Sequence, residues 1–511
     1  MSKIQKGKET KGREEWSSQL GFLMAAIGSA IGLGNIWRFP AVAYENGGGA
    51  FLVPYLIALF TAGIPALLLD YSIGHRFRGS PPLSFRRLHK KAEVIGWWQV
   101  LISFIIMVYY AVIIAWALQY MVYSVNQAWG HDSAKFFNES FLQLSEPGTV
   151  SAMPVWSIFI ALVLVWVSVL VIIGNGIQKG LERANKFFLP LLVVLFAAMV
   201  IRAITLPGAF EGLNVFFTPD WSKLYDGKVW IAAYSQIFYS LSICFGIMIT
   251  YSSYLGRRSN LSGSGYVAAF ANSSFELLAG IGVFAALGFM AVQQGVTVDK
   301  LEGISGIGLS FVTFPKIISM MPGGSYFGVL FFASLVLAGV TSLISLVQVV
   351  ASAFEDKVGW SAYKASLIIG TVAMVISLAL FSTHSGLFAL DVIDAYINEI
   401  GIVSSAIIMC VFVTVGVGKL PELRKHLNSV SSIPTGKWWE VMVGFLLPAL
   451  LSSMFITGLV RFISQGHGGY PTWYVLVFGW GAIAVGLVSA IVMTIVPWKK
   501  DENFIPIELE D

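Results

Sequence analysis

Twelve long apolar stretches divide the 511-residue chain, and a helix that crosses a bilayer needs about 20 mostly apolar residues. Only 12% of the residues are charged, roughly half the share found in soluble domains, so a chain of soluble domains is excluded. We therefore expect an all-α polytopic membrane protein. Its spans are predicted at residues 17–41, 51–73, 94–128, 154–174, 184–207, 229–255, 265–293, 326–355, 362–381, 387–417, 439–463 and 472–497.

Lysine and arginine accumulate on alternate connections between these stretches. Of the 32 basic residues, 24 lie on the side of the two termini and seven on the opposite side. Such a bias marks the cytoplasmic side. We expect a multi-pass protein of the plasma (inner) membrane, with its tails 1–16 and 498–511 in the cytoplasm. The net charge of +4 gives no indication of nucleic-acid binding, and the sequence leaves the oligomeric state open.

The first stretch contains the run GSAIGLGNIWRFP, which combines three glycines with Asn35 and Arg38. Gly28 and Gly32 have the spacing of a small-residue packing face. Together with Gly34 they also weaken a helix, by up to about 1 kcal/mol each relative to alanine. An ionisable residue within a span is costly and usually functional. Asn35 and Arg38 therefore favour a helix that unwinds where it lines a cavity.

The sixth stretch, YSQIFYSLSICFGIMITYSSYLG, is rich in hydroxyls. Apart from its last residue, it contains a single glycine, Gly246. It corresponds in position to the first stretch if spans 1–5 and 6–10 form two inverted five-helix repeats. The repeats are then residues 17–207 and 229–418, joined by an outer loop at 208–228 and followed by helices 11 and 12 at 419–497. Unwound helices 1 and 6 in matching places predict a binding site near the bilayer midplane.

Polar side chains in spans seven and eight indicate which chemistry that site supports. Asn272 and Glu276 lie one helical turn apart on one face. Thr341 and Ser342 are adjacent hydroxyls, although hydroxyls in helices often bond only to their own backbone. Oxygen-only groups without a His/Cys cluster suit an alkali cation rather than a transition metal, and half-helix ends attract a carboxylate. The residues thus point to a cation-coupled carrier of a small carboxylate solute.

The loop 294–325 contains GISGIGLSFVTFPKI, which is too rich in glycine for a plain helix and too apolar for a solvated loop. We expect a hairpin that folds into an outer vestibule. An amphipathic stretch on the membrane surface is the alternative.

Four motifs resemble those of the neurotransmitter:sodium symporters, a family that includes prokaryotic amino-acid transporters such as the bacterial leucine transporter. They are GSAIGLGNIWRFPAVAYENGGGAF at 28–51, QIFYSLSICFG at 236–246, GLSFVTFP at 308–315 and AGVTSLIS at 338–345. The resemblance covers spans 1–10 and extends to all twelve.

The resemblance implies two sodium ions and no organic cofactor. The first ion would bind the substrate carboxylate together with four residues, Ala30, Asn35, Ser240 and Asn272. The second would bind three carbonyls and two hydroxyls, those of Gly28, Ile31, Ala338, Thr341 and Ser342.

The resemblance also implies an amino-acid substrate, because monoamine carriers of the family have Asp where Gly32 stands. Tyr110 would bind the carboxylate, assisted by the amides of Leu33 and Gly34, next to Ala30 and Ser240. A mainly apolar wall favours a neutral side chain, since a charged one would be left without a partner. The wall would consist of Ile106, Ile113, Tyr239, Ser242, Phe245, Ser345 and Leu346.

Glu276 stands where chloride-dependent members of the family carry serine. The resemblance implies that its carboxylate replaces the anion, so we expect transport without chloride. Proton counter-transport through Glu276 is a further possibility that the sequence leaves open.

Gates follow from the placement of opposite charges. Arg38 and Asp394 would close the outer side. Arg13 and Asp356, packed by Trp16 and Tyr254, would close the inner side, although Arg13 alone is an ordinary basic residue of a cytoplasmic tail.

Gly180 and Pro190 have the spacing that permits local unwinding of helix 5 in relatives, whereas Pro190 alone predicts only a kink.

The expected function is a sodium-coupled symporter that imports a neutral, hydrophobic amino acid by alternating access. The alternatives are a nutrient receptor on the same fold, which binds without turnover, and a channel. An enzyme is not expected, because no activated nucleophile or metal-ligand cluster is recognisable.

Overall fold

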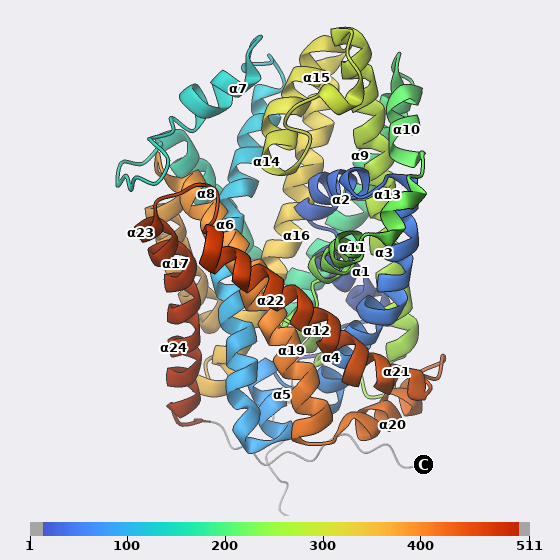
Figure 1. Ribbon diagram of the computed structural model, residues 1–511. Helices are drawn as coiled ribbons and strands as arrows, with labels where there is room; N and C mark the ends of the chain where they lie inside the picture. The colour runs from blue at the N-terminus through green and yellow to red at the C-terminus, as the bar shows by residue number, and fades with distance from the viewer. Residues whose placement is uncertain (1–13, 500–511) are drawn as a thin grey trace, which may run out of the picture.

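The computed structural model describes residues 14–499, and this part of the chain is almost entirely helical (Figure 1). Ten helices are long and apolar enough to cross a membrane, and an eleventh span is formed by α1 and α2, which are bent by 53° relative to each other. The spans are α1 (Gln19–Ala30) with α2 (Leu33–Glu45), Gly49–Phe77 (α3 and α4), Lys90–Tyr123 (with α6), Trp156–Gly174 (α8), Ile177–Ile204 (with α9), Leu261–Gln294 (α13), Gly324–Val358 (α16), Ala362–Phe381 (α17), Gly386–Gly416 (α18 and α19), Lys437–Gln465 (α21 and α22) and Thr472–Ile495 (α23 and α24).

The sixth predicted span, 229–255, is the remaining one and consists of two shorter helices. They are α11 (Gly227–Ser240) and α12 (Ile247–Ser252), and residues 241–246 between them are not helical. Neither helix alone is as long as a span needs to be. The break in the sixth stretch is thus complete, although a single glycine was its main signal in the sequence.

Helix 5 begins earlier than predicted, at Ile177 rather than at residue 184. Its first part, Ile177–Glu182, is π-helical, and α9 (Arg183–Ile204) continues it. The prediction of the start was wrong because Lys179, Glu182 and Arg183 lower the local hydropathy while the helical backbone runs through them.

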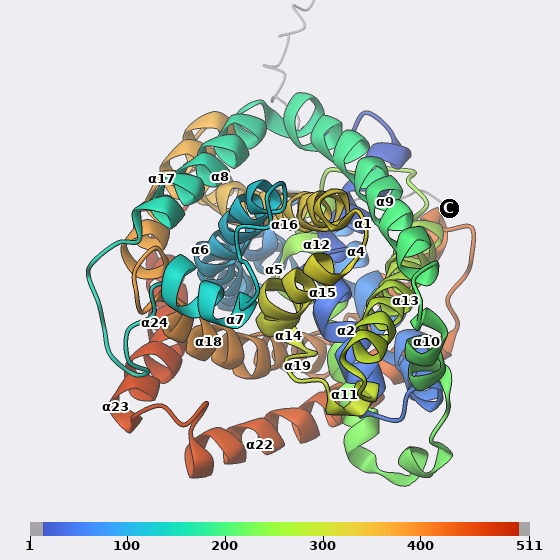
Figure 2. The same ribbon diagram turned by 90° about the horizontal axis from the view of Figure 1, so that it is seen from above.

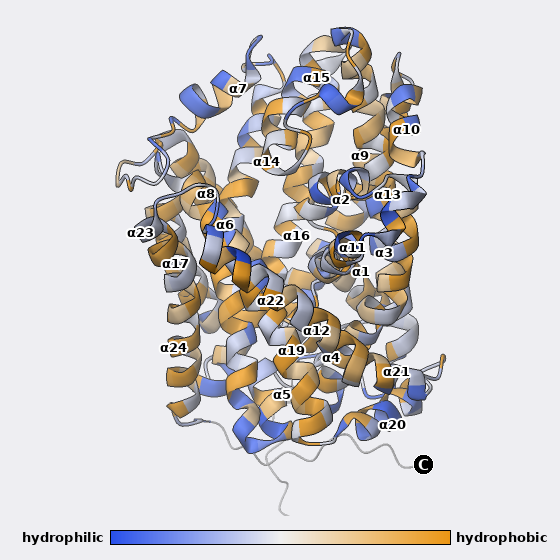
Figure 3. Ribbon diagram, in the orientation of Figure 1, coloured by the Kyte–Doolittle hydropathy of each residue, from blue (hydrophilic) through white to orange (hydrophobic). Residues whose placement is uncertain are grey.

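The helices form an inner bundle and an outer layer. Seen from above, α1, α6, α12 and α16 lie near the centre, whereas α8, α9, α17, α22 and α24 lie at the periphery (Figure 2). In the most apolar stretch of the span Lys90–Tyr123, 78% of residues are buried, against 28% in the span Thr472–Ile495. Outer side chains such as Phe187 and Val485 are 63% and 66% exposed. The peripheral helices are coloured mostly hydrophobic in Figure 3, as expected of helices solvated by lipid.

Shorter elements mark the two ends of the bundle. We call outer the end that carries α10 (Ala209–Phe217), α14 (Gly306–Gly308) and α15 (Phe314–Met320), and inner the end that carries α5 (Pro81–Leu88) and α20 (Leu420–Val430) (Figure 1). Hydrophilic residues are concentrated at these ends in Figure 3.

The break between α1 and α2 is stabilised by a side chain of the second half-helix. Ile31 and Gly32 are extended, and the side-chain oxygen of Asn35 accepts a hydrogen bond from the Gly32 N–H at 2.9 Å. The amide therefore caps α2, as short polar side chains do at helix starts. The same residue is predicted to bind the first sodium ion.

The break between α11 and α12 is held by buried side chains of other helices. Asp70 accepts a hydrogen bond from the Cys244 N–H at 2.9 Å, and the hydroxyls of Ser405 and Ser103 donate to the carbonyls of Cys244 and Phe245, both at 2.6 Å. Exposed backbone groups are not tolerated at membrane depth. These three contacts therefore allow the chain to remain unwound there.

Candidate functional site

The two breaks meet around a central cavity with a volume of about 70 Å³, enough for a few water-sized groups. The hydroxyl of Ser242, in the second unwound segment, donates at 3.0 Å to the carbonyl of Ser29 in the last turn of α1. Most of the predicted substrate residues line this cavity. They are Ala30, Gly32, Leu33, Gly34, Ile106, Tyr110, Tyr239, Ser240, Ser242, Phe245 and Leu346.

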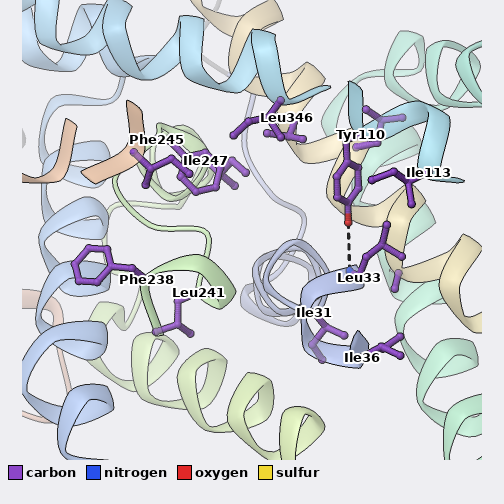
Figure 4. Close-up of a cluster of buried hydrophobic side chains, with 14 of the residues drawn as sticks. Ile31, Leu33, Ile36, Tyr110, Ile113, Phe238, Leu241, Phe245, Ile247 and Leu346 are labelled. Atoms are coloured by element: carbon purple, nitrogen blue, oxygen red, sulfur yellow. Dashed lines mark hydrogen bonds between the residues drawn. The ribbon is translucent and has the colours of Figure 1, made fainter. Parts of the chain in front are cut away.

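The polar end of the cavity is formed by Tyr110 and the start of α2. The Tyr110 hydroxyl accepts a hydrogen bond from the Leu33 N–H at 3.3 Å (Figure 4). A helix start carries a partial positive charge and free N–H groups. The hydroxyl proton of Tyr110 and the start of α2 can therefore converge on one carboxylate.

The apolar end of the cavity comes from three elements. Phe245 and Ile247 flank the start of α12, Leu346 lies on α16, and Ile106 lies on α6. Figure 4 shows Phe245 and Ile247 away from the Tyr110–Leu33 contact, with Leu346 between them and Tyr110. The cavity is thus polar at one end and apolar at the other.

The side chains predicted for the first sodium ion form a hydrogen-bonded chain. Asn35 donates to the Asn272 side-chain oxygen at 2.8 Å, and Asn272 donates to the Ser240 hydroxyl at 3.0 Å. All three are buried, and Asn35 and Ser240 also line the central cavity beside Ala30. They offer amide, hydroxyl and carbonyl oxygens next to the cavity, which is the donor type that hard cations take.

The residues predicted for the second sodium ion lie where α1 and α16 pack together. The Thr341 hydroxyl donates to the Ala338 carbonyl at 3.0 Å, and the Ser342 hydroxyl donates to the same carbonyl at 3.1 Å. A methyl group placed on Gly28 would lie 3.6 Å from Thr341 Cβ, so these two residues are neighbours across the contact. Ile31 follows directly after the end of α1. This set also consists of oxygen donors only.

The structure shows no cluster of the side chains that usually bind transition metals in the part of the chain that it describes. Residues 14–499 contain no group of three or more His, Cys, Asp or Glu side chains arranged to hold a metal ion.

Two predicted wall residues lie elsewhere. Ile113 lines the outer cavity rather than the central one, because it stands one turn further along α6 than Tyr110. The hydroxyl of Ser345 donates to the Thr341 carbonyl at 2.9 Å and accepts from the Tyr251 hydroxyl at 2.6 Å. These bonds hold Ser345 within the helix packing and away from the central cavity.

Several lining residues were not predicted from the sequence. Asn398 lies one turn after Asp394, and Tyr109 directly precedes Tyr110, so their proximity to predicted residues was the available signal. The others are plain hydroxyl or aliphatic residues, for which the sequence carries no signal. The full set is Ser29, Tyr109, Ile247, Asn398 and Ile402.

Above the central cavity lies a larger outer cavity of about 650 Å³. Tyr110 and Tyr239 line both cavities and form the floor of the outer one. Ser305, Gly306, Ile307 and Gly308 of the loop 294–325 also line it. That glycine-rich loop thus folds into the vestibule instead of lying on the membrane surface.

Arg38 and Asp394 both line the outer cavity but, within the described part of the chain, form no ion pair within 4 Å. Arg38 donates to the Ser235 hydroxyl at 3.2 Å. Asp394 accepts from the Tyr109 hydroxyl at 2.7 Å and from the Asn398 amide at 2.8 Å. The two charges predicted to close the outer side are thus each held by neutral groups, with the cavity open above Tyr239.

The inner end is closed by aromatic residues. The Trp16 ring N–H donates to the Tyr251 carbonyl at 2.8 Å, and the Trp16 backbone N–H donates to the Tyr254 carbonyl at 3.0 Å. Asp356 accepts from the Ser80 N–H at 2.8 Å. Arg13, its predicted partner, lies outside the described residues.

Glu276 is fully buried and lies one turn from Asn272. Its carboxylate accepts hydrogen bonds from the Tyr55 hydroxyl and, at 2.6 Å, from the Gln236 amide. The group that the resemblance assigns to the anion position is therefore surrounded by donors next to the first sodium residues.

Gly180 lies in the π-helical first part of helix 5, and Pro190 lies in α9. A side chain at Gly180 would collide with the Ile172 carbonyl of α8, so close packing alone requires glycine there. Pro190 lies eight residues beyond the end of the π-helical part.

Comparisons with known proteins agree with this architecture. The family model described as "Sodium:neurotransmitter symporter family" matches residues 13–134 and 129–501. An uncharacterized sodium-dependent transporter of Methanocaldococcus jannaschii is 41% identical over 486 residues, covering 94% of this chain and 97% of the relative. The human sodium- and chloride-dependent neutral and basic amino acid transporter B(0+) is 28% identical over 560 residues, covering 96% of this chain and 86% of the relative.

A solved structure is also similar. The crystal structure of MhsT in complex with L-phenylalanine superposes with a TM-score of 0.73 at 32% sequence identity, covering 88% of this chain and all of that one.

Proposed function

Because the chain belongs to the sodium:neurotransmitter symporter family, we propose that it imports a neutral, hydrophobic amino acid together with sodium by alternating access. The observation that carries this proposal is that two polar groups lie at the same end of the cavity. One is the Tyr110–Leu33 hydrogen bond, and the other is the hydrogen-bonded chain Asn35–Asn272–Ser240. A carboxylate bound by Tyr110 would also face these oxygens. The substrate would thereby complete the coordination of the first sodium ion.

The rest of the cavity supports a neutral side chain. Its walls beyond the polar end are Ile106, Phe245, Ile247 and Leu346, and a charge buried among them would have no partner. Gly32 supplies no carboxylate, so the substrate must bring its own. The similar structure with bound L-phenylalanine supports a substrate of this kind.

Two sodium ions would provide the driving force. Each positive charge that moves inward gains about 2.3 kcal/mol per 100 mV of membrane potential. The first group includes Ala30 and Asn35 and the second includes Gly28 and Ile31, so both ions would bind next to the break between α1 and α2. Ion binding would therefore order the segment that also binds the substrate.

Chloride would not be required. The Glu276 carboxylate supplies a negative charge beside Asn272 and Ser240 within the protein itself. We further propose that the termini lie in the cytoplasm, because basic residues accumulate on that side.

In alternating access, the outer end of the protein would close and the inner end would then open. The outer cavity reaches down to Tyr239, whereas Trp16 and Tyr254 close the inner end. Closure of the outer side would bring Tyr239 over the substrate and draw Arg38 toward Asp394. Opening of the inner side would break the Trp16 hydrogen bonds.

The test is uptake of a panel of radiolabelled neutral amino acids into proteoliposomes, with and without an inward sodium gradient at a fixed membrane potential. Sodium-dependent accumulation of one or a few would establish the symporter. Sodium-dependent binding without uptake would instead indicate the receptor, and neither binding nor uptake would refute the proposed substrate class.

A further inference from the structure

Asn185, on α9, has a buried side-chain oxygen with no hydrogen-bond partner among the described residues. The residue is fully buried. An amide oxygen left without a partner in a protein interior is energetically costly. Such a group in a folded protein calls for a ligand or another reason to be there.

The orientation of this amide is determined by its other end. The Asn185 nitrogen donates to the Leu181 carbonyl at 2.9 Å. A carbonyl can only accept, so the nitrogen must face Leu181 and the oxygen must face away from it. The oxygen is therefore directed across to helix α1.

On α1, the oxygen faces Gly28. A Cβ atom built on Gly28 would lie 2.5 Å from the Asn185 oxygen, and the next nearest atoms include Thr341 Cβ at 3.6 Å. Gly28 and Thr341 both belong to the set proposed for the second sodium ion. The absence of a side chain at Gly28 is what leaves space for the Asn185 oxygen beside that set.

We propose that the side-chain oxygen of Asn185 is a further ligand of the second sodium ion, contributed by helix 5. An amide carbonyl is a neutral oxygen donor of the kind that binds hard cations. The number and strength of such dipoles influence which alkali ion a site prefers. The inference rests on the proposed function, because it requires that the second sodium ion be bound.

The same side chain also connects the ion to the backbone of helix 5. Leu181, which Asn185 holds, lies in the π-helical part between Gly180 and α9. Binding of sodium by the Asn185 oxygen stabilises the orientation that keeps this hydrogen bond. Loss of sodium would free the amide and loosen the segment 177–182.

The test is binding of ²²Na⁺ to the purified full-length protein, without amino acid and in a potassium background. Asn185→Leu replaces the amide by two methyl groups on a side chain of the same branching, so it removes the oxygen together with the donor to Leu181. Asn185→Asp keeps an oxygen and adds a charge. Asn175→Ala is the matched control, because Asn175 makes the same type of bond, to the Val171 carbonyl, but is exposed.

We expect Asn185→Leu to raise the half-saturating sodium concentration about fivefold. A change of this size corresponds to the loss of one moderate polar interaction. We expect Asn185→Asp to lower it, and Asn175→Ala to leave it unchanged. Hydrogen exchange of residues 177–185 should be slower in sodium than in potassium for the wild type but not for Asn185→Leu.

Wild-type sodium affinity in Asn185→Leu would overturn the assignment and leave Asn185 as a packing residue. If Asn185→Leu does not fold, an unchanged or weakened affinity in Asn185→Asp would overturn it equally. Absence of ²²Na⁺ binding to the wild type would refute the proposed function itself, and this inference with it.

Discussion

The guanidinium group of Arg38 lies over the ring of Tyr239, with 4.4 Å between the guanidinium carbon and the ring centroid. Gly34 also packs against this ring, and its lack of a side chain leaves room for the ring. The Tyr239 ring thus contacts both Arg38 and the start of α2. Tyr239 lines both cavities, together with Tyr109, Tyr110 and Asn398, so we expect the position of its ring to influence whether the two cavities communicate.

Gly34→Ala should disturb this contact. The added methyl would lie well within 3.0 Å of the Tyr239 ring, a separation that real side chains do not reach. The ring must move outward, so we expect at least about a tenfold loss of substrate affinity. Equilibrium binding of the transported amino acid measures this. Gly227→Ala, at a position with open space around it, should bind as the wild type does, and equal binding by both variants would contradict the proposed role of Tyr239.

Tyr110→Phe tests the carboxylate end of the cavity. It removes the hydroxyl next to the Leu33 N–H while keeping the ring. A hydrogen bond to a charged group contributes about 1.5–3 kcal/mol, so we expect affinity to fall by about tenfold or more. The effect should disappear for the corresponding amino-acid amide, which has no carboxylate. An equal loss for the amide would show that Tyr110 acts only by packing.

The breaks could be predicted from the sequence because lipid makes polar groups costly. The assignment of Asn35, Ser240 and Asn272 to a sodium ion was implied by the family resemblance and stays a prediction. Asn35 and Asn272 within spans had to be explained by a partner or a ligand, and the structure pairs them with each other. The cost of burying such groups is large enough to leave a signal in a single sequence.

The sequence could not predict at which level of the bundle, central cavity or outer cavity, a given helical residue lies. Tyr110 and Ile113 share a face of α6 at a spacing of three, yet only Tyr110 lies at the level of the central cavity. Asn185 was missed for a related reason. Its significance depends on the amide orientation imposed by Leu181 and on the space beside Gly28, and neither is visible in a sequence.

Glu276→Ser should convert the protein to chloride dependence. The variant removes the carboxylate that accepts from Tyr55 and Gln236 but leaves both donors in place. These donors then face a space without a negative charge, which an anion can fill. We expect wild-type uptake to be equal in chloride and gluconate, and uptake by Glu276→Ser to require chloride. Strong loss of wild-type uptake in gluconate would refute the proposed role of Glu276.

His426 should make the stability of the protein depend on pH. It lies on α20 at the inner end, with its ring nitrogen 2.9 Å from that of His75, whose second nitrogen faces the Gly256 carbonyl at 3.0 Å. The carbonyl requires a proton on His75 Nε2, so His75 Nδ1 accepts and His426 donates. Burial, reinforced by His75 and Arg76, lowers the pKa of His426 from 6.5 to about 3.

The sign of the effect follows from proton binding. Between about pH 6.5 and pH 3 the unfolded state holds a proton on His426 that the folded state lacks, so the free energy of unfolding falls as the pH falls. The loss amounts to at most about 1.4 kcal/mol per pH unit. Above pH 6.5 this contribution is constant.

His426→Gln keeps an N–H donor but does not titrate. We expect its thermal midpoint in detergent to fall less than that of the wild type between pH 7.5 and pH 4.5. The control is His131→Gln, an exposed histidine of the outer end, which should follow the wild type. If His426→Gln loses as much stability in acid as the wild type, the acid sensitivity arises elsewhere and His426 is not its source.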